Sequence, residues 1–73
     1  MDWDKLRIFH AVADAGSLTH AGDVLHLSQS AVSRQIRELE EELGVDIFLR
    51  AGKRLTGLTQ PGAELLPIVE CLL

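Results

Sequence analysis

The feature that most constrains this chain is a tight break between two segments of helical pattern. Ser17 opens a short segment, residues 26–27 interrupt it, and Ser28 opens a longer segment that Gly44 ends. Serine is a preferred N-cap, and glycine readily takes the left-handed conformation that closes a helix. Two helices with so short a connection are typical of the helix-turn-helix, in which the first helix positions the second on a DNA duplex.

The longer segment, residues 28–43, has two distinct faces. Its core stripe falls within about 40° of arc at helical spacing and consists of Val32, Ile36, Leu39 and Leu43. Small hydroxyls and arginines lie roughly 100–200° away, and small residues allow close approach to a duplex. Arginine can fork onto guanine, and Gln29 can pair with adenine. The candidate major-groove residues are therefore Gln29, Ser30, Ser33, Arg34 and Arg37.

This helix alone is equally compatible with a solvated charged face, in which the arginines and the acids Glu38 and Glu40 to Glu42 contact only water. The short helix before it favours DNA binding. We expect the acids to lie toward the end of the helix that leaves the groove. Residues Ser17, Thr19 and Ser28 at the helix starts are candidate phosphate contacts, although capping explains Ser17 equally well.

The remaining segments complete a recognisable order of elements. Residues 2–15 predict a first helix capped by Asp2, with Leu6, Phe9, Val12 and Ala13 facing inward and Trp3 one turn earlier. In the second helix the residues expected to turn inward are Leu18, Ala21, Val24 and Leu25. Residues 46–58 predict a small hairpin, with a β-prone run at 47–49, a turn at 51–53 and a return strand at 55–58. Three helices, a hairpin and a trailing helix form a mainly α winged helix-turn-helix.

The fourth helix, residues 60–73, follows the N-cap Thr59 and has an unusually apolar surface for a terminal helix. Pro61 fits its first turn, whereas Pro67 is expected to bend it or to disturb its early hydrogen bonds.

The net charge of −4 hides a local basic region. Five of the seven cations fall between positions 34 and 54. Three of them, Arg50, Lys53 and Arg54, surround the predicted turn of the hairpin. A duplex senses the field within about 8–10 Å at physiological salt, so a basic edge on an acidic body is compatible with DNA binding. A basic hairpin tip can follow phosphates or enter a narrow minor groove.

Other classes of function find little support. No nucleophile–base pair, glycine-rich phosphate loop or carboxylate pair indicates an enzyme. His10, His20 and His26 do not form a metal-ligand cluster, and a single cysteine, Cys71, cannot form an internal disulfide. A metal or thiol redox sensor remains an alternative with few residues to support it. No signal peptide or membrane-spanning stretch is apparent, so the cytoplasm is the expected compartment.

The sequence resembles the N-terminal DNA-binding domain of the LysR-type transcriptional regulators over essentially its whole length. The resemblance lies in the segment AVADAGSLTHAGDVLHLSQSAVSRQIRELEEELGVDIFLR and in the following LTQPG, and the stretch LSQSAVSRQIRELEEELG is highly specific. It implies a winged helix-turn-helix over residues 1–59, with the two-helix motif at about 18–37 and the wing at about 46–58.

The resemblance also implies roles for particular residues and partners. The third helix reads a double-stranded DNA operator, and the wing contacts the backbone or the minor groove. Residues 60–73 begin the linker helix through which such proteins form homodimers, which implies dimerisation roles for Leu65, Leu66, Val69, Leu72 and Leu73. No cofactor is expected in this segment, because a small-molecule effector binds a separate C-terminal domain that is expected to be absent here.

Two positions depart from the usual family pattern. Ser30 stands where proline is frequent, which should add a polar contact. The wing RAGKRLTGLT is one residue longer than the commonest form. Such a wing resembles the branch that regulates sulfur and cysteine metabolism, whereas the first half of the chain fits that branch poorly. The alternative function is protein association alone, through the acidic 38–46 segment and the apolar fourth helix.

Overall fold

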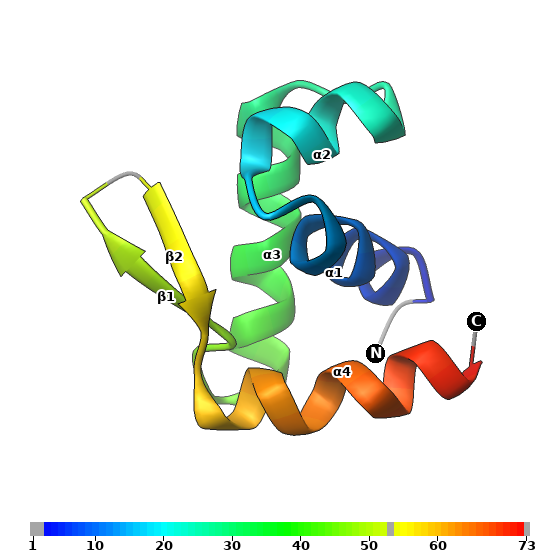
Figure 1. Cartoon of the computed structure of the whole chain (residues 1–73), viewed down its shortest axis with the longest axis vertical. Coiled ribbons are helices and arrows are strands. Elements are labelled where there is room, and N and C mark those ends of the chain that lie inside the picture. The colour runs from blue at the N-terminus through cyan, green and yellow to red at the C-terminus, as the bar shows by residue number, and fades with distance from the viewer. Residues whose placement is uncertain (1–2, 53, 73) are drawn as a thin grey trace.

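The computed structural model describes residues 3–52 and 54–72 and has the predicted order of elements. Helix α1 (Trp3–Ala15) is followed by α2 (Leu18–Leu25), α3 (Gln29–Leu43), β1 (Phe48–Ala51), β2 (Arg54–Leu58) and α4 (Gln60–Leu72). In Figure 1 the hairpin stands beside α3, and α4 crosses the end of the molecule opposite α2. The expected cap Asp2 lies outside the described residues.

The predicted caps explain where α2 and α3 begin and end. The hydroxyl oxygen of Ser17 accepts from the N–H of His20 at 3.1 Å, and that of Ser28 accepts from the N–H of Ala31 at 3.1 Å. Gly44 ends α3 in the left-handed conformation, with φ 74°. His26 ends α2 in the same conformation, with φ 59°, although it carries a side chain.

The turn between α2 and α3 is packed closely against Gly22. The N–H of Leu27 donates to the carbonyl oxygen of Gly22 at 2.8 Å. A Cβ on Gly22 would stand 2.6 Å from the carbonyl oxygen of Leu27, so only glycine allows this approach. The helix-turn-helix geometry thus depends on a residue that the sequence pattern did not single out.

The core forms where α1 contacts α2, α3 and α4. Phe9 and Phe48 meet there with ring centroids 5.5 Å apart. The predicted stripe of α3 is confirmed, since Val32, Ile36 and Leu39 are fully buried and Leu43 packs against them. Leu6, Phe9, Val12, Leu18 and Ala21 are also buried as expected.

Two apolar side chains lie elsewhere than predicted. Val24 was expected to face inward but is 60% exposed. At about 100° per residue, Val24 lies roughly 100–120° around α2 from Leu18 and Leu25, outside the buried face. Trp3, one turn before the buried Leu6, is 48% exposed.

The wing is a two-stranded antiparallel hairpin with one irregularity. Phe48 pairs with Leu58 and Leu49 with Gly57, whereas Arg50 pairs with Leu55. One extra residue, Thr56, therefore stands on β2 as a β-bulge. Ala51, expected in the turn, is the last residue of β1.

Helix α4 is locked to the beginning of β1. Thr59 caps α4 by accepting from the N–H of Gly62 at 3.1 Å, and its hydroxyl donates to the carbonyl oxygen of Asp46 at 2.6 Å. A Cβ on Gly62 would overlap the carbonyl oxygen of Ile47. The helix continues through Pro67 without interruption. No helix in the described ranges is long and apolar enough to cross a membrane.

Candidate nucleic-acid interface

The exposed face of α3 presents the predicted reading residues to solvent. Gln29, Ser30, Arg34 and Arg37 are exposed, and Ser33 is half-buried. Their direction follows from the opposite stripe, because burial of Val32, Ile36 and Leu39 leaves only this face free.

These residues line one open groove between α3 and the wing. Its volume is about 590 Å³, and its lining consists of Leu18, Gln29, Ser30, Ser33, Arg34, Arg37, Arg50 and Gly52. All five candidate major-groove residues thus share a single surface with part of the wing. The arrangement brings polar hydrogen-bonding groups and three arginines to one side of the molecule.

A second, smaller hollow joins the start of α2 to the wing. Its volume is about 150 Å³, and it is lined by Gly16, Ser17, Leu18, Thr19, Gln29, Arg54 and Leu55. Candidate phosphate contacts from two parts of the sequence therefore meet here. The oxygens of Ser17 and Ser28 already act as caps, while Thr19 is exposed. Lys53, the third predicted wing cation, lies outside the described residues.

The exposed arginines differ in their ion pairs. Arg50 pairs with Glu40, with Nη2 and Oε1 3.0 Å apart. Within residues 3–52 and 54–72, no ion pair engages Arg34, Arg37 or Arg54. The guanidinium groups of these three are therefore free of the described acids and available to an anionic partner.

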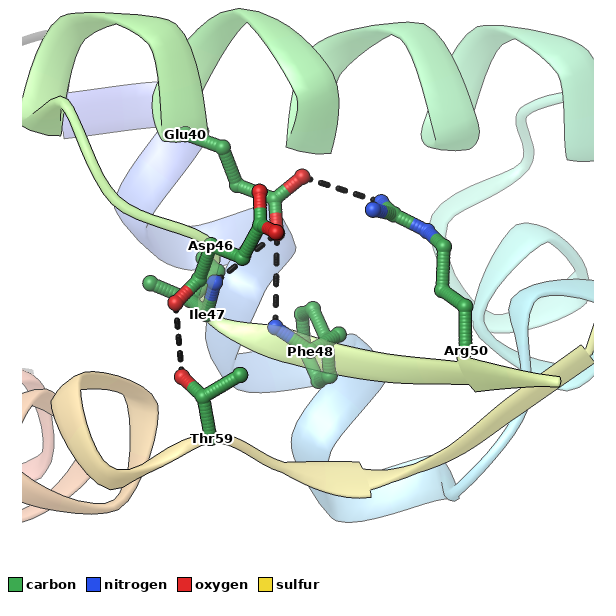
Figure 2. A network of polar contacts seen from close by, with 6 residues as sticks. All are labelled: Glu40, Asp46, Ile47, Phe48, Arg50 and Thr59. Carbon is green, nitrogen blue, oxygen red and sulfur yellow. Dashed lines mark hydrogen bonds and ion pairs between the residues drawn. The ribbon is translucent and has the colours of Figure 1, made fainter.

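Glu40 is the residue at this site that the sequence reading missed. The alternative of a solvated charged face placed it among acids that contact only water, but it is only 6% exposed. Figure 2 shows its carboxylate between α3 and β1, where it accepts from the backbone N–H groups of Ile47 and Phe48 and from Arg50. A weak signal existed, since Glu40 lies one turn after the core residue Ile36, about 40° around the helix from it.

Two neighbouring acids, Glu38 and Glu42, also have a cationic partner in this chain. Lys5 on α1 lies 2.7 Å from Glu42 and 3.9 Å from Glu38. The acidic surface proposed for protein association therefore has one buried member and two that pair with α1.

The apolar surface of α4 is narrower than expected. Val69, predicted at a dimer interface, is 1% exposed and belongs to this chain's own core, so its side chain does not lie on a free surface. Leu65 and Leu66 are partly buried against that core. Ile68 and Leu72 are the exposed large residues of this helix, at 58% and 55%. Leu73 lies outside the described residues.

The histidines and the cysteine do not gather into a site. His10 lies 3.7 Å from Glu70 on α4, while His20 and His26 are exposed around α2. Cys71 is exposed and unbonded. Among the described residues, no group of three or more His, Cys, Asp and Glu side chains has metal-binding proximity.

Sequence comparison connects this geometry to known proteins. Residues 3–63 match the profile of a family described as bacterial regulatory helix-turn-helix proteins, lysR family. The chain is 51% identical over 74 aligned positions to the HTH-type transcriptional regulator SsuR of Burkholderia cenocepacia. That alignment covers 100% of this chain and 24% of SsuR, so the chain spans about a quarter of its relative's length.

Solved structures share the fold closely. The crystal structure of a CbnR_DBD–DNA complex superposes with a TM-score of 0.90 at 35% identity, covering 99% of this chain and 82% of that one. A BenM_DBD/catB site 1 DNA complex gives a TM-score of 0.91 at 36% identity, covering 99% and 76%. These likenesses, with the order of elements, confirm the winged helix-turn-helix.

Proposed function

This chain belongs to the lysR family of bacterial regulatory helix-turn-helix proteins, and we propose that it reads double-stranded DNA as the DNA-binding domain of a transcription regulator. The observation that supports this most strongly is the open groove in which five polar or cationic residues of α3 lie beside the wing. The solved relatives CbnR_DBD and BenM_DBD, which have the same fold, were crystallised with DNA.

In this proposal the first half of α3 enters the major groove. A groove about 12 Å wide admits one helix. Arg34 and Arg37 can each present two parallel N–H groups to guanine O6 and N7, and Gln29 can bond adenine N6 and N7. Ser30 and Ser33 allow the helix backbone to approach the base edges because their side chains are small.

The wing and the start of α2 lie together beside α3 and contact the duplex backbone there. Arg54 shares a hollow with Ser17 and Thr19, and its guanidinium is not paired with a described acid. We propose that this hollow receives a phosphate. Phosphate contacts set the register of the protein and contribute affinity without sequence preference.

A homodimer would place two such surfaces on one operator. We propose that α4 joins the two copies through a surface that includes Ile68 and Leu72, which the chain leaves exposed. Half-sites one helical turn apart, about 34–36 Å, or multiples of that spacing, would then match the two reading helices.

We further propose that the chain itself has no catalytic role, in keeping with relatives named as transcriptional regulators. It would act in the bacterial cytoplasm, where its operator lies. A small-molecule effector would bind the whole regulator outside these 73 residues. The chain matches only 24% of SsuR, which leaves most of such a regulator for that task.

Selection of bound sites from a random-duplex pool tests the proposal directly. The expected result is a two-fold symmetric motif, bound with an affinity that falls steeply with salt, with a slope near −0.9 per neutralised phosphate. Recovery of unenriched sequences, with binding insensitive to salt, would favour protein association instead.

A further inference from the structure

Glu40 is a buried carboxylate on a helix whose next two residues, Glu41 and Glu42, are exposed. Burying a carboxylate is unfavourable unless hydrogen bonds and an opposite charge replace its water. Glu40 has both kinds of partner, which explains how the fold accommodates it. This acid lies next to a surface that should meet phosphates, where a negative charge by itself opposes binding.

The two carboxylate oxygens have different partners. Oε2 accepts from the N–H groups of Ile47 at 2.8 Å and Phe48 at 3.3 Å, where β1 begins. Oε1 accepts from Nη2 of Arg50 at 3.0 Å, further along the same strand. As Figure 2 shows, one side chain of α3 thus holds both the root of the wing and a wing cation.

Arg50 retains donors that Glu40 does not use. A guanidinium has five N–H groups in a rigid plane, and the bond to Oε1 engages only one edge of it. The side chain is 33% exposed and lines the groove shared with the reading residues of α3. A second edge of the plane is therefore available on the groove side.

We propose that Glu40 is a positioning residue for DNA binding: it fixes Arg50 so that the free edge of the guanidinium takes a backbone phosphate, and it fixes the wing relative to α3. This inference rests on the proposed function. Glu40 itself does not contact DNA, because its oxygens are engaged and its side chain is buried.

The substitution Glu40→Gln distinguishes this proposal from an effect of charge alone, because the two predict opposite changes in DNA affinity. Removing a negative charge near phosphates should tighten DNA binding if charge alone matters. The glutamine oxygen can still accept from Ile47 and Phe48, but its NH₂ group then faces Arg50, and two donors cannot bond. Arg50 is released while the start of β1 keeps an acceptor, so positioning predicts weaker binding.

The experiment compares the wild-type chain, Glu40→Gln and the matched control Glu41→Gln, which removes the same charge from an exposed neighbouring position. Fluorescence anisotropy is measured over a salt series with the duplex that the wild-type chain selects. We expect Glu40→Gln to bind about tenfold more weakly, with a salt slope shallower by about 0.9, as for one lost phosphate contact. Glu41→Gln should bind equally or more tightly.

NMR spectra of the free chains supply a readout that needs no DNA. Glu40→Gln should shift the amide resonances of Ile47, Phe48 and Arg50 and leave those of α2 in place, whereas Glu41→Gln should not move the wing. If the wild-type chain bound no duplex, the proposed function would fail. An unchanged wing spectrum in Glu40→Gln would overturn the positioning role itself.

A second variant tests the proposal even if Glu40→Gln does not fold. Arg50→Lys keeps a cation beside Glu40 but lacks the planar second edge. We expect about tenfold weaker binding at an unchanged thermal midpoint. Equal affinity of Arg50→Lys and wild type, or tighter binding by a folded Glu40→Gln, would contradict the proposal.

Discussion

Arg34 and Arg54 are both exposed, but at the scale of single residues they lie on different surfaces. Arg34 lies on α3 among the groove residues, whereas Arg54 lies on the wing beside the start of α2. A contact to a base edge discriminates between sequences, and a contact to a phosphate does not.

We therefore expect Arg34→Ala to lose about 1–3 kcal/mol of preference for the selected duplex over a random one. Arg54→Ala should weaken binding to both duplexes alike and reduce the salt slope by about one. Parallel anisotropy titrations of the two variants check this. Equal losses of preference in both variants would mean that the two surfaces are wrongly assigned.

His26 is a residue-scale source of strain, because it is the described non-glycine residue with positive φ, at 59°. The left-handed conformation costs about 1–2 kcal/mol for a residue with a Cβ, more than the extra backbone entropy of glycine, about 0.5–1 kcal/mol.

His26→Gly should accordingly raise the free energy of unfolding by about 0.5–1 kcal/mol. Urea denaturation followed by circular dichroism measures this. The control His20→Gly, within α2, should instead lower stability by roughly 0.3–0.5 kcal/mol, because histidine is itself a modest helix former. A loss of stability in His26→Gly would show that the imidazole makes a favourable contact.

Individual residues also mark the limit of reading the sequence alone. The exposed face of α3 was predictable, because the stripe of Val32 and Ile36 determines what lies opposite. Glu40 was not, because its burial depends on β1, which packs against α3 only in the folded chain. The inward prediction for Val24 was wrong because its position around α2, roughly 100–120° from Leu18 and Leu25, points it to solvent despite its apolar side chain.

At the scale of elements, the connection between α2 and α3 is set by a close backbone approach. Gly22 is the helical residue against which the turn packs, with its carbonyl bonded to the N–H of Leu27. In an open helix, alanine would be favoured over glycine by about 1 kcal/mol. Here the 2.6 Å approach of the Leu27 oxygen to a new Cβ reverses that preference.

Gly22→Ala should therefore lower the free energy of unfolding by about 1–3 kcal/mol, because backbone must move to relieve the overlap. Thermal denaturation is the measurement. Asp23→Ala, at the next and exposed position of α2, should stay within about 0.5 kcal/mol of wild type. A stabilised Gly22→Ala would show that the turn adjusts without strain.

The elements themselves were largely predictable, since caps and glycines are local signals. Ser17, Ser28 and Thr59 begin helices as expected, and Gly44 ends one. The β-bulge of the wing was not predicted, although Gly57, a glycine inside the expected return strand and next to Thr56, is a sequence signal for such an irregularity.

At the scale of the whole molecule, the apolar residues of α4 divide between the core of the chain and its exposed surface. Val69 closes the core of this chain, whereas Ile68 and Leu72 face outward. The sequence predicted an apolar helix but could not divide its residues between the chain's own core and a partner, since both uses require the same side chains.

Replacing both Ile68 and Leu72 with aspartate should abolish self-association and leave the thermal midpoint of the monomer nearly unchanged. Val69→Ala should lower stability by about 2 kcal/mol instead, because it leaves a cavity in the core. Sedimentation velocity over a concentration series, with thermal denaturation, checks both. Self-association that survives the double substitution would place the dimer contact elsewhere.

The bulge at Thr56 determines which face of the wing the side chains of Arg54 and Leu55 occupy. Side chains alternate along a strand, so an uninterrupted β2 would place Arg54 on the same side as Leu58, toward the body of the molecule. The extra residue reverses the alternation: Leu55 is half-buried instead, and Arg54 is exposed. A wing of the same sequence that kept Thr56 in the ladder would have the same cations but would turn its tip arginine away from any duplex.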